Sequence, residues 1–101
     1  MNLNLAFRNH PEQPARISAI YKLMVDFELV KRCHRLEARE ATREELLMLH
    51  DENYLESLVA IPKMRQATLN QMQRQYGSVF LCPDSYEAAL ISAGSSLQVT
   101  P

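Results

Sequence analysis

The stretch "TREELLMLHDENYLESLVAIP", Thr42 to Pro62, contains two helix starts in close succession. Thr42 followed three residues later by Glu45 is the capping-box pattern, in which hydroxyl and carboxylate each accept a backbone N–H at the helix start. Asp51 is a favourable N-cap for a second helix, and Pro62 ends it. We therefore predict two short helices here: the first runs through Leu46, Leu47 and Leu49, and the second has a buried face formed by Tyr54, Leu55, Leu58 and Val59.

Toward the N-terminus, apolar residues recur every three or four positions from Ala15 onward, which predicts a helix that fades near Leu29-Val30. Pro14 suits its first turn, where the missing donor costs nothing. The apolar stripe comprises Ile17, Ile20, Met24 and Phe27. Before the helix, the alternating residues Leu3, Leu5 and Phe7 are typical of the end of a half-buried strand.

Toward the C-terminus, a polar helix is predicted over 66–76, with Gly77 as its C-cap. Two segments have weak strand character: 33–39, "CHRLEAR", and 78–83, "SVFLCP". Asp84 and Glu87 form a second capping-box pattern, which predicts the start of the last helix. The small residues of that helix, "AALISAGSS", predict close packing against a neighbour.

Composition limits the class of protein. The length of 101 residues suits one small domain, and 47% hydrophobic with 23% charged residues is typical of a globular chain. A net charge of −1 provides no basic surface for nucleic acid or an anionic membrane, and no apolar run is long enough to span a bilayer. Two cysteines are too few for a disulfide scaffold, and nothing resembles a secretory leader. We expect a reduced, intracellular chain that binds neither nucleic acid nor membrane.

Two candidate sites have simpler structural interpretations. The candidate zinc ligands are Cys33, His34, His50 and Cys82. Their spacing contains no CxxC or HxxxH pattern, which favours buried or half-exposed structural roles. The two helices from Thr42 to Ile61 suggest a helix-turn-helix, but without a basic recognition face plain packing is favoured. Since Gly77 and Gly94 are the only glycines, there is no Gly-rich phosphate loop, and no catalytic constellation follows from the residues alone.

A resemblance to a known family rests on three segments in register. They are "HPEQPARI" at 10–17, "CHRLEAREATREELLMLHDENYLESL" at 33–58 and "YGSVFLCPDSYEAALISAGSSLQV" at 76–99. Over about residues 7–99 the chain resembles the N-terminal part of a zinc-dependent histone deacetylase domain. The resemblance is to class II, and most closely to class IIb, the branch that includes polyamine deacetylases. Leu81 stands before Cys82-Pro83, where class I enzymes carry an acidic residue that grips the substrate.

The resemblance implies an α/β fold, the arginase-deacetylase fold, with a parallel sheet flanked by helices and a site at the carboxyl ends of the strands. This chain would be the mostly helical N-terminal portion, with one or two short strands. His10 and Pro11 match part of the active-site rim, Arg16 an arginine of the inner channel, and Ser78 a serine that accepts a hydrogen bond from the substrate backbone. Structural alternatives remain open for each residue. His10 would cap or pack its loop, Arg16 would pair with a buried carboxylate, and Ser78 would hydrogen-bond the edge of a strand.

The family's catalytic motifs are not found in this sequence. A histidine pair, an Asp-x-His and a further Asp are missing, and the three histidines His10, His34 and His50 are isolated. We expect residues 1–101 to be a partial deacetylase domain, truncated before the catalytic motifs, with no catalytic or metal-binding residue and no zinc of its own. The complete domain would hydrolyse acetyl-lysine amides of histone or non-histone proteins, or acetylated amines.

The alternative is a non-catalytic helical module or truncated isoform. Such a chain would bind a protein partner through exposed apolar helix faces. The class II resemblance is compatible with both cytoplasm and nucleus.

Overall fold

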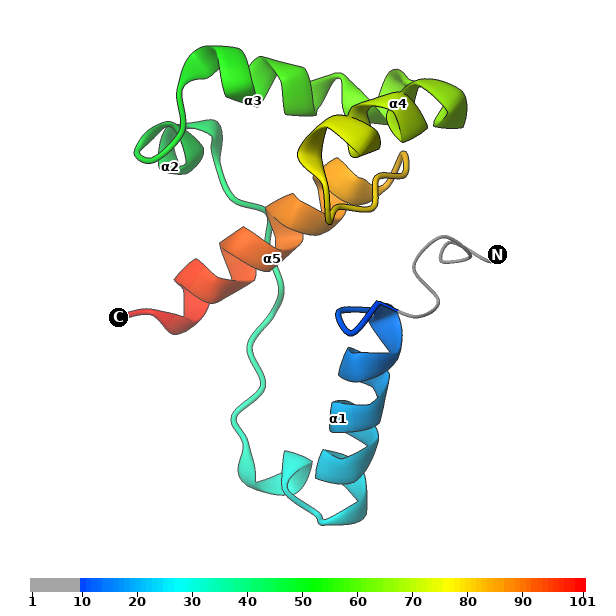
Figure 1. Ribbon diagram of the computed structural model, residues 1–101. Helices are drawn as coiled ribbons and strands as arrows, with labels where there is room; N and C mark the ends of the chain where they lie inside the picture. The colour runs from blue at the N-terminus through cyan, green and yellow to red at the C-terminus, as the bar shows by residue number, and fades with distance from the viewer. Residues whose placement is uncertain (1–9) are drawn as a thin grey trace. The chain divides into compact units, whose positions relative to one another are not determined.

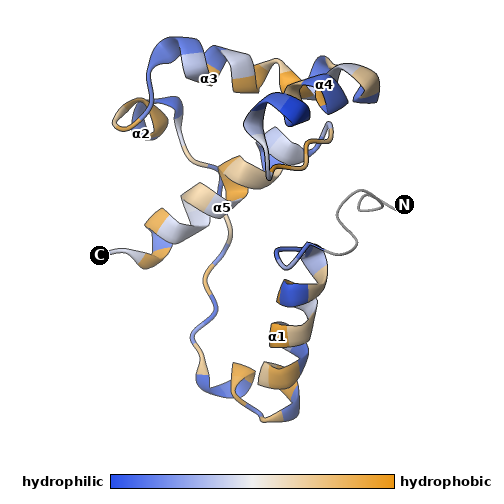
Figure 2. Cartoon of the chain, in the orientation of Figure 1, coloured by the Kyte–Doolittle hydropathy of each residue, from blue (hydrophilic) through white to orange (hydrophobic). Residues whose placement is uncertain are grey.

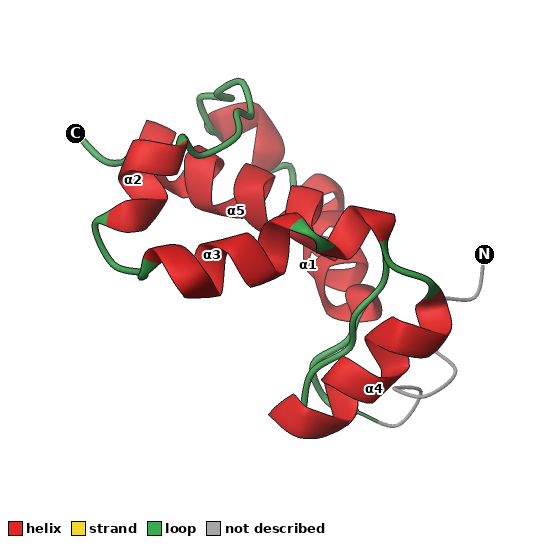
Figure 3. Ribbon diagram, turned by 90° about the horizontal axis from the view of Figure 1, so that it is seen from above, coloured by secondary structure: helices red, strands yellow, loops and turns green. Residues whose placement is uncertain are grey.

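The computed structural model describes residues 10–101, and every regular element in that range is helical (Figures 1 and 3). The chain divides into two compact units, Met1–Arg35 and Leu36–Pro101. The predicted strand end at Leu3, Leu5 and Phe7 lies outside the described residues. Within 10–101, no helix combines the length and the apolar character that crossing a membrane requires.

The first unit contains the predicted proline-led helix. Helix α1 spans Pro14–Asp26, with Pro14 in its first turn, and a 3₁₀ turn, η2, follows at Val30–Arg32. The helix ends earlier than its apolar pattern does, because Glu28 has a positive φ of 59° that a right-handed helix cannot contain. Its stripe is largely solvent-exposed: Ile17 and Phe27 have 72% and 71% of their surface accessible.

The second unit begins with the two capped helices. Helix α2 spans Arg43–Leu47, and its capping box is complete: Glu45 N donates to Thr42 Oγ1 at 3.2 Å, and Thr42 N donates to Glu45 Oε1 at 2.9 Å. Helix α3 spans Glu52–Val59, and Tyr54 N donates to the Asp51 carboxylate at 2.7 Å. Both predicted caps are confirmed. Pro62 follows in a 3₁₀ turn, η3, at Ile61–Lys63.

Two longer helices complete this unit. Helix α4 spans Gln66–Tyr76 and ends as predicted at Gly77, whose positive φ of 79° favours glycine. Helix α5 spans Ser85–Val99. The predicted capping box at its start is wrong. Asp84 has helical backbone angles, φ −88° and ψ −2°, and its side chain caps nothing, because a capping side chain is normally held by an extended N-cap.

Neither segment with strand character is a strand. Residues 34–41 and 78–82 are irregular in the structure, and no strand occurs anywhere in the described range (Figure 3). A strand needs the backbone of a second strand to satisfy its N–H and C=O groups. In the later segment, side chains of α4 bond Leu81 instead, as described below.

The core of the second unit lies where α4, η3 and the loop before α5 meet. Ile61, Leu69 and Leu81 form its buried centre, surrounded by the partly buried Leu58, Met64, Met72 and Tyr86. Helix α5 contacts η3, and it also approaches the backbone that precedes α2. There Ala41 N donates to Leu90 O at 3.0 Å, opposite Gly94. This confirms the expected close packing of the small-residue helix.

Candidate functional site

Two of the four predicted site residues, His10 and Pro11, lie in the loop before α1, and a third, Arg16, lies in the first turn of that helix. His10 is half-buried and Pro11 is exposed at the start of the described chain. Glu12 N donates to His10 Nδ1 at 3.0 Å, so the imidazole stabilises the turn that leads into the helix. The Glu12 carboxylate in turn accepts a hydrogen bond from the Arg16 guanidinium, one helical turn away. Glu12 therefore links His10 to Arg16.

Glu12 was missed by the sequence analysis, although its spacing of four from Arg16 is that of a helical ion pair. The hydrogen bond from Arg16 lowers the pKa of Glu12, and the same bond raises the pKa of Arg16. The pair is exposed, with 51% of the Arg16 side chain and 68% of the Glu12 side chain accessible. The structural alternative of a buried carboxylate partner is therefore wrong, and water screens this pair strongly.

Ser78 lies in the second unit, at the centre of a three-residue turn. Val79 N donates to Gly77 O at 2.9 Å, which closes the turn directly after α4. The Ser78 side chain is exposed. Since no strand forms here, the alternative role of Ser78 at a strand edge does not hold for the described residues.

The loop that carries Ser78 is held by two glutamine side chains of α4. Gln73 Oε1 accepts from Leu81 N at 2.9 Å, and Gln66 Nε2 donates to Leu81 O at 2.8 Å. The two glutamines are seven residues apart, which places them on one face of the helix after two turns. We call this arrangement the glutamine clamp. It satisfies both backbone groups of Leu81, as a neighbouring strand would do.

The position that distinguishes this chain from class I is buried. Leu81 is 8% accessible and belongs to the core, so its side chain points away from any ligand at the loop surface. Cys82 is also buried, as expected of a structural cysteine, and its N–H donates to Ser85 Oγ at 2.9 Å. The loop before α5 is thus fixed by the clamp and by Ser85, rather than by the capping box that the sequence suggested.

The residues considered for zinc do not assemble a ligand set. Cys33 is exposed rather than buried or half-exposed as expected, and its thiol lies 3.4 Å from Leu29 O. His50 stacks against Tyr54 with ring centroids 5.2 Å apart. Over residues 10–101, no group of three or more His, Cys, Asp or Glu side chains is placed to hold a metal ion. The described residues therefore do not fit the zinc that the resemblance implies.

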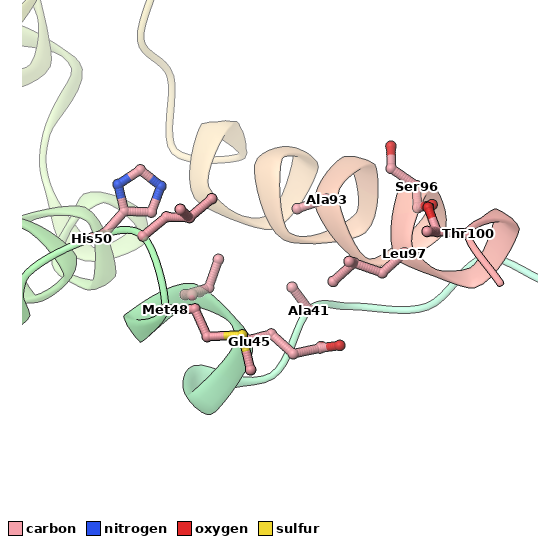
Figure 4. Close-up of a pocket in the computed structure, with 10 residues that line it drawn as sticks. Ala41, Glu45, Met48, His50, Ala93, Ser96, Leu97 and Thr100 are labelled. Atoms are coloured by element: carbon pink, nitrogen blue, oxygen red, sulfur yellow. The ribbon is translucent and has the colours of Figure 1, made fainter.

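An apolar groove lies between the end of α2 and the C-terminal half of α5 (Figure 4). Its volume is about 630 Å³. The apolar part of its lining consists of Ala41, Leu46, Met48, Leu49, Ala93 and Leu97. Met48 and Leu49 are 79% and 88% accessible, and Figure 2 shows further hydrophobic residues along α5. Large apolar side chains this exposed are typical of a surface that packs against something else.

Comparison with known proteins identifies the family. The model of the family described as "Histone deacetylase domain" matches residues 10–100. Over 88 residues the chain is 32% identical to the polyamine deacetylase HDAC10 of Danio rerio, and over 92 residues it is 32% identical to histone deacetylase 6 of Caenorhabditis elegans. Over 101 aligned residues it is 30% identical to histone deacetylase HDA1 of Candida albicans. The chain belongs to the histone deacetylase domain family, on its class II side.

These alignments cover most of this chain but little of the relatives. They span 87%, 89% and 88% of the chain, and 13%, 10% and 12% of the three relatives respectively. The chain therefore corresponds to a fragment of a deacetylase domain, and the predicted family is confirmed. The family implies the arginase-deacetylase fold, of which the described residues show the helices and no strand.

Proposed function

We propose that this chain supplies part of the rim and inner channel of a lysine or amine deacetylase, without its catalytic centre. The proposal rests on Ser78, which matches a substrate-binding serine of class IIb and is presented on a tight turn backed by the glutamine clamp. Its hydroxyl can accept a backbone N–H of an acetylated substrate. His10 and Pro11 would form another part of the rim, and Arg16 would line the inner channel.

The zinc on which this family depends supplies an activated water when it is bound. We assign no step to it here, since the described residues offer no ligand set. What this chain contributes is positioning. Leu81 stands where class I enzymes carry the acidic group, and its side chain lies in the core. An acetylated peptide or an acetylated polyamine would therefore meet the Ser78 hydroxyl at this loop, with no carboxylate at position 81. Two of the three relatives above are named histone deacetylases and the third a polyamine deacetylase, which leaves both substrate classes within the proposal.

Activity and metal content of the purified chain test the missing catalytic centre. We expect no turnover of an acetyl-lysine peptide or of an acetylated polyamine, and less than stoichiometric zinc by atomic emission. Turnover that a chelator abolishes would contradict the proposal.

The substrate role of Ser78 is tested in a complete deacetylase domain that includes this sequence. Ser78→Ala should weaken transition-state binding of a peptide substrate by about 1 kcal/mol, the scale of one hydrogen bond. A peptide whose backbone amide is N-methylated at the residue facing Ser78 should be insensitive to the substitution. If both peptides respond equally, Ser78 does not bind the substrate backbone.

The second candidate is a non-catalytic module, and the groove lined by Met48 and Leu49 favours it. In this case the chain would bind a deacetylase or another protein through that surface, in cytoplasm or nucleus. Titration of the chain into an active class II deacetylase, with activity and light scattering recorded together, tests it. Saturable binding that Leu49→Glu removes supports the module, whereas no binding at the highest soluble concentration rules out a deacetylase as its partner. The exposed Leu23 of α1, 55% accessible, provides a matched control as Leu23→Glu.

A further inference from the structure

One long segment of the chain is basic and contains no carboxylate. Residues 57–83 include Lys63, Arg65 and Arg74 but no aspartate or glutamate, in a chain whose net charge is −1. Lys63 and Arg65 are exposed, and neither forms an ion pair with any residue in the range 10–101. Cations without carboxylate partners are available to an acidic surface on another molecule.

These two cations precede an exposed hydroxyl at a fixed spacing. Lys63 lies five residues and Arg65 three residues before Thr68, which is exposed. Between them the backbone is extended, with φ −86° and ψ 148° at Met64 and φ −73° and ψ 151° at Arg65. Protein kinases select substrates through charge patterns, and acidic pockets in their peptide clefts bind cations upstream of the acceptor. We propose that Thr68 is a phosphorylation site for a serine/threonine kinase with such an acidic cleft.

Access to Thr68 requires only one helical turn to open. Thr68 is the third residue of α4, and this helix begins without a side-chain cap and without an acidic residue in its first turn. Two backbone bonds, from Thr68 N and Leu69 N to Arg65 O at 3.0 and 3.1 Å, close the turn. Uncapped helix ends open with the smallest free energy in a folded chain. Leu69 is fully buried and anchors the helix beyond that point.

A second threonine has the same upstream arginine but a different environment. Arg39 lies three residues before Thr42. However, the Arg39 guanidinium donates two hydrogen bonds to the Glu45 carboxylate, at 2.9 and 3.0 Å, and one to Gln98 Oε1 at 3.0 Å. Thr42 Oγ1 is itself the N-cap acceptor of α2. The two groups that a kinase would recognise, the Arg39 guanidinium and the Thr42 hydroxyl, are therefore both hydrogen-bonded within the fold. Thr42 is thus an internal control for Thr68.

The chemistry is ordinary phosphoryl transfer from a nucleoside triphosphate bound to the kinase. Thr68 Oγ1 forms a bond to the γ-phosphorus, the bond from that phosphorus to the β–γ bridging oxygen breaks, and the nucleoside diphosphate leaves. The hydroxyl proton passes to the base of the kinase. The product places a phosphate at the third position of α4, the position that Glu45 occupies in α2. An anion there favours the helix start, and Arg65 and Lys63 lie next to it in the chain.

Incubation of the purified chain with Mg-ATP and an arginine-directed serine/threonine kinase tests the proposal, with site occupancy measured by mass spectrometry. Synthetic peptides 37–48 and 61–72, which each contain one threonine and no serine, are run in parallel. The ratio of the phosphorylation rate at Thr68 to the rate at Thr42 should be at least about tenfold larger in the folded chain than the same ratio measured with the two peptides. The reason is that only the folded chain keeps the Arg39 hydrogen bonds. An equal preference in chain and peptides overturns the structural argument.

Charge-neutralising variants test the recognition itself. Arg65→Gln should lower the initial rate at Thr68 about tenfold or more, whereas Arg74→Gln, which removes another exposed cation within α4, should leave it unchanged. Incorporation at Thr68 should also slow hydrogen exchange at the first amides of α4. If the chain remains unmodified while peptide 61–72 is phosphorylated, the turn does not open and the proposal fails. If neither is modified, the proposed recognition of Lys63 and Arg65 is wrong.

Discussion

The close approach of α5 to the backbone before α2 predicts an unusual response to an alanine substitution in a helix. A Cβ added at Gly94 would lie 2.5 Å from the Glu40 carbonyl carbon and 2.6 Å from Ala41 N, and closer still to Arg39 O. Favourable carbon contacts are about 3.5–4.0 Å long, so the backbone before α2 must move away by about 1 Å. Gly94→Ala should therefore destabilise the unit.

The magnitude follows from three contributions. Overpacking a tight contact costs about 1–3 kcal/mol. The required shift also strains the bond from Ala41 N to Leu90 O, which contributes about 1 kcal/mol. Against these, replacing glycine by alanine inside a helix gains about 1 kcal/mol. We expect a net loss of about 1–3 kcal/mol in the free energy of unfolding.

Urea unfolding followed by far-UV circular dichroism measures this loss, and hydrogen exchange at the Ala41 amide locates it. Ser92→Ala is the matched control, because it lies on the exposed part of the same helix and gains helix propensity without a steric contact. The control should be neutral or slightly stabilising. If Gly94→Ala also raises the urea midpoint, α5 does not approach the Arg39–Ala41 backbone as the structure shows, and the reasoning is refuted.

Three further predictions concern the same unit. The Arg39 hydrogen bond, followed by the bond from the Thr42 N–H, lowers the pKa of Glu45 from 4.5 to about 2. The stabilisation of the folded unit by ionised Glu45 is thus complete above pH 4.5 and is lost as the pH falls toward 2. In Glu45→Gln, the urea midpoint should therefore depend less on pH over that interval. Leu81→Asp, measured by circular dichroism, should cost about 3 kcal/mol or more and abolish cooperative unfolding, because it places an unpaired charge in the core; the exposed Ser78→Asp should not. Gln73→Ala should accelerate hydrogen exchange at the Leu81 amide about fivefold, with Gln75→Ala unchanged; equal rates in both variants would contradict the clamp.

Local patterns predicted the helices well because their causes are local. The capping box at Thr42, the Asp51 cap, the proline-led start of α1 and the C-cap at Gly77 each depend on a few neighbouring residues, and all are present in the structure. The capping pattern at Asp84 failed because the preceding turn, fixed by Cys82 and Ser85, holds Asp84 in a helical conformation. The residue type at a cap position can be read from the local sequence, but its backbone angles depend on the surrounding structure.

The candidate site was less predictable, because its contacts join residues from different turns or elements. The resemblance identified His10, Arg16 and Ser78, yet it did not reveal that Glu12 bonds both His10 and Arg16. The four-residue spacing was the available indication of the Glu12–Arg16 ion pair. Such pairs are common on exposed helices, so the spacing alone does not single out a site. The burial of Leu81 was also beyond the sequence, since an apolar residue before Cys-Pro is equally compatible with a surface rim.

The glutamine clamp explains why a segment of strand-like composition is not a strand and yet is well positioned. Val79, Phe80 and Leu81 have high strand propensity, but propensity alone leaves the N–H and C=O groups without partners. Gln66 supplies a donor and Gln73 an acceptor from one helix face, so the loop is fixed at the single residue Leu81 rather than along a strand ladder. The rest of the loop, including Ser78, is free to form a tight turn. In a paired strand, the backbone groups on either side of Leu81 would instead be hydrogen-bonded to the neighbouring strand. Because the clamp acts through side chains, a substitution in α4 alters the loop without altering the loop's own sequence, and this links the surface of α4 to the proposed substrate rim.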